Sequence, residues 1–300
     1  MKNISRIACV CFFIWAALPL AGQEGESFDR IIEIDDGKPV QFNFIDVDGN
    51  LTFSTWDRDQ VEIHVRKETR VRDPKRASRL LKEIRTVLDH RGNSIRLEIR
   101  YPHIRGFIIG IHDTDRIDIT TEIRVPARTH ITCRTEDGSI RGSGVHGDLK
   151  IETEDGSIRV SDITGDISAV SEDGRIILEN ITGGVTAESE DGDILFSGKA
   201  TRLRLENQDG DIDAAVLSGS RMETDWWIES EDGDIDLRLP LDFPADFYII
   251  TEDGDIDSRL PITLHDLASR SKLKGRLNQG GKMLTLKTED GDITLRENRK

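Results

Sequence analysis

Thr135-Glu136-Asp137-Gly138-Ser139-Ile140 is the first of a series of closely similar stretches from which the fold can be predicted. Copies begin at Thr153, Ser171, Ser189 and Asn207, so that their Asp-Gly pairs begin at the evenly spaced positions 137, 155, 173, 191 and 209. Three further Asp-Gly pairs begin at positions 232, 253 and 290, after longer steps. The longer steps predict insertions between the last units.

Each unit of the repeat divides into two short strands. The isoleucine that follows an Asp-Gly turn is succeeded, half a unit later, by a second apolar residue, as Ile140 is by Leu149 and Ile158 by Ile167. Apolar and polar residues alternate around both positions, which is typical of short strands bounded by tight turns. The glycine of each Asp-Gly pair fits such a turn, because glycine adopts a positive φ without steric cost.

These strands could form a meander of hairpins or a β-solenoid, and the constant step favours the solenoid. Stacked coils place equivalent residues above one another and share one apolar core. A six-residue left-handed helix is disfavoured, since steps of six from Ile140 reach His146 and Glu152, and a propeller blade needs a longer repeat. We predict a mostly-β protein, a single-stranded and β-helix-like solenoid with about 18 residues per coil and one helix in an N-terminal cap region.

Residues 1–23 predict a signal peptide. Lys2 and Arg6 precede an almost wholly apolar run over 7–21, and small residues follow at Ala21 and Gly22, as in secretory signals. The run is short for a membrane span of about 20 residues, and no cysteine follows it where a lipid anchor would be attached. We expect export to the periplasm, the cell surface or the medium, without a stable membrane span after cleavage. A retained anchor is the alternative.

Charge divides the chain near residue 130. The net charge is −16, and it becomes −18 when the two basic residues of segment 1–23 are removed. Residues 24–130 hold 20 acidic and 19 basic residues, whereas residues 131–300 hold 37 acidic and 20 basic residues. We expect a strand–helix–strand cap region over 24–130 and acidic solenoid repeats over 131–300. Nucleic acid is not expected as a partner, because phosphate binding needs clustered lysine and arginine.

The N-terminal region contains an early, degenerate coil and a helix. Segment 42–53 resembles the later units, and Asp73-Pro74 supplies the N-cap and the first residue of a helix. The helix could cover the open end of the core, which we favour, or dock a partner. The apolar segment 104–111 is either a further buried strand or an exposed contact patch. The helix is expected to continue to about Arg91, because one helical face carries Leu80, Leu81, Ile84, Val87 and Leu88.

Stacked coils would align the acidic turn residues in columns with a spacing of about 4.8 Å. Like charges repel at that distance, and calcium, which takes six to eight oxygen ligands, could bridge adjacent coils. Solvated turns, ordered divalent sites and direct ligand recognition are the three interpretations. The candidate calcium site lies where acidic residues are densest, at Asp211, Asp213, Asp234, Asp236, Asp255, Asp257 and Asp292.

Two further features are candidates for contacts with a partner. On a strand, Trp226 and Trp227 would point to opposite sides, so that one exposed ring could bind a sugar or a protein, or pack on the solenoid edge. A basic run near the C-terminus is expected on the outer side of a strand, where it hinders edge-to-edge association. It consists of Arg270, Lys272, Lys274 and Arg276.

No residue set singles out a catalytic site. The sequence lacks the Gly-x-Ser-x-Gly, His-Glu-x-x-His and P-loop motifs, and its seven histidines show no metal-ligand spacing. A pair of carboxylates could serve a polysaccharide-cleaving enzyme, but every such pair here belongs to the repeat. Cys133, the only cysteine after segment 1–23, lies in an alternating strand and is expected to be buried rather than reactive.

The order of segments along the chain carries one more signal. It runs through 48–53, 56–57, 61–63, the helical insertion, 123–127, the tandem Glu-Asp-Gly-x-Ile units, 243–247 and 277–281 ahead of 290–293. This order, over about residues 28–297, resembles a family of exported bacterial β-strand-repeat proteins known as putative adhesins, with a domain of unknown function. The resemblance implies a β-solenoid outside the cytoplasm, a role in adhesion or envelope scaffolding, and no catalytic residues. The chain departs from the family in placing Glu-Asp before the turn glycine, where an uncharged residue and asparagine are common.

The sequence therefore predicts a non-catalytic, exported adhesin-like or envelope-scaffold protein. Its partner would be a protein or glycan of the cell envelope, bound along one face of the solenoid. A calcium-stabilised extracellular repeat module and a polysaccharide-active β-helix enzyme are the alternatives. No cofactor is expected apart from calcium.

Overall fold

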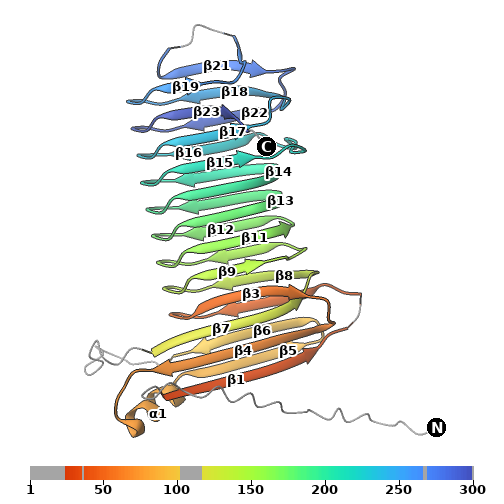
Figure 1. The fold of residues 1–300 in the computed structure, drawn as a ribbon, viewed down its shortest axis with the longest axis vertical. Coiled ribbons are helices and arrows are strands. Elements are labelled where there is room, and N and C mark those ends of the chain that lie inside the picture. Colours follow the sequence, from red (N-terminus) through yellow and green to blue (C-terminus); the bar gives the residue numbers. More distant parts are fainter. Residues whose placement is uncertain (1–23, 36, 102–116, 266–268, 299–300) are drawn as a thin grey trace, which may run out of the picture.

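A computed structural model describes residues 24–35, 37–101, 117–265 and 269–298. In these residues it contains 23 strands and a single helix. Hydrogen bonds join the strands into one sheet that winds around a long axis, so that the protein is a tall stack of coils (Figure 1). The predicted mostly-β solenoid is confirmed. The predicted signal peptide, residues 1–23, and the apolar segment 104–111 lie outside the described residues.

The regular coils lie in the middle of the stack and keep the constant step of the sequence repeat. Ile158 pairs in parallel with Ile140 on one side and with Ile176 on the other, and Ile176 pairs with Ile194. Equivalent residues of successive units therefore lie directly above one another. The strands of these coils are β8 (Thr129–Arg134), β9 (Ile140–Ser143), β10 (Leu149–Glu152), β11 (Ile158–Thr164), β12 (Ile167–Ser171), β13 (Ile176–Ser189), β14 (Ile194–Asn207), β15 (Ile212–Val216), β16 (Trp226–Ser230) and β17 (Ile235–Leu239).

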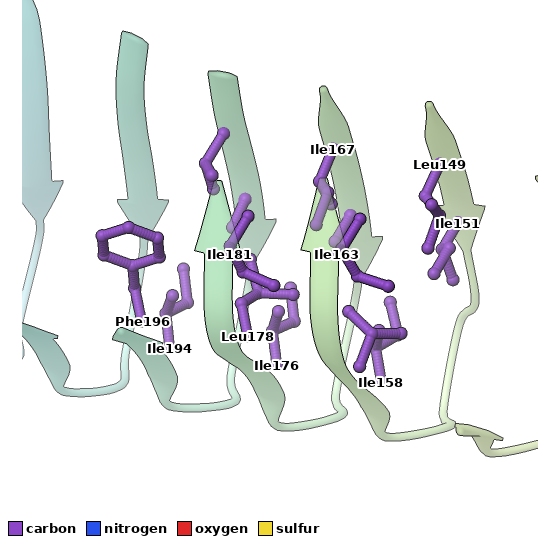
Figure 2. Close-up of a cluster of buried hydrophobic side chains, with 14 of the residues drawn as sticks. Leu149, Ile151, Ile158, Ile163, Ile167, Ile176, Leu178, Ile181, Ile194 and Phe196 are labelled. Carbon is purple, nitrogen blue, oxygen red and sulfur yellow. The ribbon is translucent and has the colours of Figure 1, made fainter. Parts of the chain in front are cut away.

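Each coil contributes one strand segment to each of two faces. The first face contains β8, β10, β12, the second halves of β13 and β14, and β16. The second face contains β9, β11, the first halves of β13 and β14, β15 and β17. Ile158, Ile176 and Ile194 are fully buried in the apolar core between the faces (Figure 2). Each such side chain contributes about 1.5–3 kcal/mol by its burial, which no coil could achieve alone.

The stacking order departs from the chain order at the N-terminal end. The coil of β2 (Val40–Ile45) and β3 (Asn50–Trp56) pairs in parallel with β8 and β9 on one side. On its other side it pairs in parallel with β6 (Ser94–Arg100) and β7 (Ile117–Pro126). The predicted early coil is therefore confirmed, but it lies inside the stack and extends both faces.

Antiparallel strands and the helix α1 close this end of the stack. β1 (Glu24–Glu33) pairs with β4 (Gln60–Thr69), which pairs with β7, and β5 (Arg85–Arg91) pairs with β6. α1 (Pro74–Glu83) contacts β1 and β4 at the end of the stack (Figure 1), which agrees with the favoured covering role. The predicted N-cap is confirmed, because Asp73 accepts a hydrogen bond from the Lys75 amide at 3.0 Å.

The predicted length of the helix is wrong. α1 ends before Ile84, which is already extended, and Val87 and Leu88 lie in β5. Pairing with β6 overrides the helical spacing, because it supplies a row of backbone hydrogen bonds that a longer helix would lose. The buried Lys67 donates from Nζ to the Ile84 carbonyl at 2.7 Å, so that a cation lies at the C-terminal end of the helix, where it is favourable.

The chain order is broken again at the C-terminal end. β22 (Met283–Lys287) lies between β16 and β18 (Ala245–Ile250), and it is parallel to both. β23 (Ile293–Glu297) lies between β17 and β19 (Ile256–Ser258), also in parallel. The last coil of the chain is therefore held between two coils that precede it in the sequence. β21 (Lys272–Leu277) pairs antiparallel with β18 and with β20 (Thr263–Leu264) at the end of the stack (Figure 1).

The longer repeat steps hold insertions, as predicted. In the step from Asp209 to Asp232 the insertion lies between β15 and β16. In the step from Asp253 to Asp290 it contains β20 and β21, after which the chain returns to form the inner coil of β22 and β23.

Three residues of the basic run lie on the outer side of β21, as predicted, whereas Arg270 precedes the strand. Lys272, Lys274 and Arg276 are exposed and alternate with the buried Leu273 and Leu277. β20 pairs with only two residues of β21. The role of the run in hindering edge-to-edge association stays a prediction.

The core crosses the charge boundary near residue 130. One cluster of buried hydrophobic residues extends from Ile32 to Leu295. The charge differs between residues 24–130 and 131–300, but the two parts share one core. Their division into a cap region and a repeat region stays a prediction. Cys133 belongs to this cluster and is 1% exposed. Its burial raises the pKa of its thiol, in agreement with the expected buried and unreactive side chain.

Candidate functional site

The Glu-Asp-Gly turns form a hydrogen-bonded ladder along one edge of the stack. The Glu172 amide donates to the Glu154 carbonyl of the neighbouring coil at 3.0 Å. The buried Ser171 hydroxyl donates to the Gly156 carbonyl at 3.1 Å and accepts from the Gly174 amide at 2.9 Å. Similar contacts recur at Thr153, Ser230, Thr251 and Thr288.

The turn glycines are required for close approach, and the predicted positive φ is wrong. Gly156, Gly174 and Gly192 are not among the described glycines with positive φ. A Cβ on Gly174 would lie 2.1 Å from the Gly156 carbonyl oxygen. Each turn therefore packs directly on the turn of the next coil, and a side chain would force them apart.

Fifteen acidic residues project from this edge, which we call the acidic edge. Partial desolvation, followed by the charges of Glu154 and Glu190, raises the pKa of Glu172. Gln208 replaces the glutamate in one coil. The acidic edge consists of Glu136, Asp137, Glu154, Asp155, Glu172, Asp173, Glu190, Asp191, Asp209, Glu231, Asp232, Glu252, Asp253, Glu289 and Asp290.

Four of the candidate calcium residues form a row that extends the backbone ladder. The Asp211 carboxylate accepts from the Asp234 amide at 2.9 Å, and Asp234 accepts from the Asp292 amide at 2.8 Å. Asp292 accepts from the Asp255 amide at 2.8 Å. The row follows the stacking order, so that Asp292 lies between Asp234 and Asp255. One oxygen of each of the first three carboxylates is thus used for a structural hydrogen bond.

The other three candidate calcium residues are paired with arginines. Asp213 pairs with Arg238, Asp236 with Arg296 at 3.4 Å, and Asp257 with Arg259 at 3.4 Å. In the part of the chain that the structure describes, no group of three His, Cys, Asp or Glu residues is close enough to hold a metal ion. Calcium binding at these residues stays a prediction.

We expect sodium chloride to raise the melting temperature, because it screens the repulsion between stacked carboxylates. The rise should be about 2–4 °C for each kcal/mol of repulsion relieved. If carboxylates of adjacent coils hold calcium jointly, calcium chloride of equal ionic strength raises it further, and Asp234→Asn reduces the difference. Scanning calorimetry of both proteins in both salts measures this. An equal rise in the two salts would reject the calcium-stabilised alternative.

The tryptophan pair divides between the inside and the outside, as predicted. Trp226 is 1% exposed, and its ring centroid lies 5.2 Å from that of Phe243. Trp227 is 37% exposed. Its Nε1 donates to Glu229 at 2.8 Å, and Glu229 accepts from Lys287 Nζ at 2.8 Å. Burial alone would raise the pKa of Glu229, but these hydrogen bonds and the Lys287 charge lower it.

A groove runs along the outer side of the first face and reaches Trp227. It has a volume of about 690 Å³ and crosses the strands from β2 to β16. Ser168, Gly184 and Thr186 line its middle, where short side chains leave the sheet uncovered. We call this hollow the outer groove.

Gly184 and Arg202 shape the middle of the outer groove. Gly184 stands in the column of Asp148 and Asp166, and Arg202 reaches across it to pair with Asp166. A Cβ on Gly184 would lie 2.8 Å from both Arg202 Nε and Asp166 Oδ1. One sequence signal marks this part of the groove, because Gly183-Gly184 replaces the Gly-Asp pair found at 147–148 and 165–166 in the preceding coils. Nothing in the sequence indicated a role for Arg202, Glu229 or Lys287.

Asp46 replaces the buried hydroxyl residue in the coil of β2 and β3. It is 3% exposed and accepts hydrogen bonds from the Val47 amide at 2.7 Å and the Tyr101 hydroxyl at 3.0 Å. Its second oxygen has no hydrogen-bond partner among the described residues. Burial raises the pKa of Asp46 to about 6, against the lowering effect of these hydrogen bonds and with a smaller contribution from Asp48.

Asp46→Thr is expected to stabilise the protein at pH 7.5 by about 1–3 kcal/mol. The pKa of Asp46 is 3.8 without perturbation and about 6 in the fold, so the native state binds the proton more tightly. The contribution of Asp46 to stability therefore falls as pH rises from about 4 to about 6, and the gain from threonine disappears near pH 4. Urea unfolding at pH 4 and pH 7.5 measures both values.

The reverse change in a regular coil, Thr153→Asp, is the matched control and should destabilise most at neutral pH. A gain from Asp46→Thr that is equal at both pH values would contradict the titration of this carboxyl.

These features define a solenoid whose coils stack through their turns and present one grooved face. The family model described as Toastrack DUF4097 matches residues 44–296. The chain therefore belongs to the Toastrack family, and the resemblance to a family with a domain of unknown function is confirmed. No curated protein matches the chain significantly. Among the described residues, no helix has both the length and the hydrophobicity to cross a membrane.

Three solved structures are similar to this chain over most of its length. A putative cell adhesion protein from Clostridium sporogenes ATCC 15579 is 8% identical, with a TM-score of 0.27, and the match covers 91% of this chain and 100% of that one. A putative adhesin from Bacteroides fragilis NCTC 9343 is 13% identical, with a TM-score of 0.37, over 91% and 97%. A putative lipid binding protein from Parabacteroides distasonis ATCC 8503 is 11% identical, with a TM-score of 0.30, over 92% and 97%. At these values the similarities carry no argument about function.

Proposed function

We propose that this protein is a non-catalytic binding protein that acts outside the cytoplasm and holds a protein or glycan of the cell envelope along its first face. The outer groove carries the proposal, because it is continuous across seven strands and ends at an exposed tryptophan. The proposed export rests on the signal pattern of residues 1–23. An exported protein that binds an envelope component in this way would act as an adhesin or as a scaffold of the envelope.

The uniform use of the carboxylates supports binding rather than catalysis. Glycosidases need two carboxyl groups whose environments differ from those of all others. Here the carboxylates of Asp211, Asp234 and Asp292 each accept a hydrogen bond from the backbone amide of the aspartate in the next coil. The Glu-Asp-Gly turns likewise repeat one pattern of backbone hydrogen bonds. Among the described Glu-Asp-Gly turns no pair of carboxylates differs from the others, whereas Asp46 in the coil of β2 and β3 is set apart by its burial and raised pKa.

Filling the outer groove tests this proposal. Thr186→Arg places a long side chain in the middle of the groove on β13. Ser197→Arg, its matched control, places the same side chain at a half-buried outer position of the second face on β14. We expect the wild type and Ser197→Arg to co-sediment saturably with isolated cell envelopes, and Thr186→Arg to lose at least nine tenths of this binding. Equal binding of both variants would contradict a role for the first face.

A further inference from the structure

We infer that the outer groove binds a neutral polysaccharide chain laid along the solenoid axis, with Trp227 as the surface on which one sugar ring stacks. This inference rests on the proposed binding function and names its ligand class. The seven strands that the groove crosses span about 29 Å at the usual strand spacing. The groove is therefore long enough for several sugar units in a row.

Trp227 is held in one orientation before any ligand arrives. Its indole nitrogen is bound by Glu229, and Glu229 is bound in turn by Lys287 on the neighbouring strand β22. An exposed ring without such contacts would lose conformational entropy when a ligand orders it. The hydrogen-bonded arrangement reduces this loss and leaves the apolar ring available for the apolar side of a pyranose.

The neighbouring coil continues the surface beyond Trp227. Thr285 pairs with Trp227 on one side and with Tyr248 on the other. It is only 8% exposed although its side chain points outward. Trp227 and Tyr248 therefore lie on either side of Thr285, at equivalent positions of strands β16 and β18.

The charges of the outer groove favour a neutral ligand. Its lining contains three basic side chains and three aspartates, and two of these, Arg202 and Asp166, already pair with each other. The acidic edge, by contrast, carries fifteen acidic residues. A strongly anionic or cationic polymer finds no complementary charge in this lining. The charged residues are Lys150, Arg202, Arg204, Asp148, Asp166 and Asp225.

The polar groups of the groove fit sugar hydroxyls better than a peptide. Thr132, Ser168 and Thr186 supply hydroxyls that both donate and accept, as sugar hydroxyls do. The strands beneath are paired on both sides, so no strand edge is free for an added peptide strand. An amphipathic helix would need an apolar floor, which these short polar side chains do not provide.

Titration of the full chain with soluble neutral polysaccharides tests the inference, with dextran, mannan and xyloglucan as probes and dextran sulfate and alginate as charged counterparts. We expect saturable binding of at least one neutral probe and none of its charged counterparts. Trp227→Ala should weaken this binding about tenfold or more, Thr186→Arg should abolish it, and Ser197→Arg should leave it unchanged. Circular dichroism of each variant shows whether it is folded.

Glu229→Gln tests the positioning of the tryptophan. It should weaken binding less than Trp227→Ala and change the indole fluorescence of the free protein. Failure of all neutral probes, or unchanged affinity of folded Trp227→Ala, would overturn the inference. Groove-dependent envelope binding without polysaccharide binding would leave the proposed function standing with a protein partner. Release of cleaved oligosaccharides would overturn the non-catalytic proposal instead.

Discussion

Deletion of residues 282–300 is expected to unfold the C-terminal end of the stack, including strands that precede the deletion in the sequence. β22 and β23 lie between the coil of β16 and β17 and the coil of β18 and β19. Their four fully buried side chains contribute about 6–12 kcal/mol by burial, which is comparable with the whole stability of a typical domain. These side chains are Leu284, Leu286, Ile293 and Leu295.

Hydrogen exchange of the amides in β18 and β21 measures this effect. We expect both strands to lose protection in the truncated protein, because β18 loses its parallel partner β22. Deletion of residues 24–33 is the control, since β1 pairs with β4 at the opposite end of the stack, and β18 should then stay protected. Retained protection of β18 after the C-terminal deletion would contradict the placement of β22 between β16 and β18.

Gly174→Ala is expected to destabilise the protein by about 3 kcal/mol. The new Cβ would lie 2.1 Å from the Gly156 carbonyl oxygen, 2.5 Å from its carbon and 2.6 Å from Ser171 Oγ. Backbone atoms cannot move away without breaking the hydrogen bond of Ser171 and separating two coils. The substitution therefore loses turn contacts as well as adding strain.

Urea unfolding of this variant should be compared with that of Gly25→Ala. Gly25 lies in β1, and its nearest atom to an added Cβ is the Lys67 carbonyl oxygen at 3.5 Å, an ordinary contact. Its replacement should change stability by less than about 0.5 kcal/mol. Equal effects of the two substitutions would mean that backbone propensity, and not close turn packing, explains the column of glycines.

Periodicity was sufficient to predict the regular part of the fold. The constant step of the repeat brings Ile140, Ile158 and Ile176 into register, because each coil needs the next to bury its apolar residues. The alternation that placed Trp226 inside and Trp227 outside worked for the same reason, since successive side chains of a strand point to opposite sides. The early coil and the N-cap at Asp73 were equally local patterns.

The candidate site was predictable only in part. Trp227 could be identified from the alternation of its strand, but the groove beside it arises from residues of seven strands that meet only in the stack. The importance of Gly184 depends on Arg202, whose side chain crosses to Asp166 two coils away. The spacing of Val87 and Leu88 suits a helix, whereas pairing with β6 makes them part of a strand.

The coil length, the inward and outward residues and the acidic edge all follow from the repeat alone, because they depend on contacts between equivalent positions of similar units. The order of the coils at the two ends emerges only in three dimensions, where the first and last units of the chain lie inside the stack. Sequence cannot specify this order locally, since any coil can pair with any similar coil. The segments with antiparallel partners, such as β1 at one end and β21 at the other, do not offer the parallel pairing that a further coil needs. They therefore terminate the stack, and the repeat-like coils occupy the positions within it.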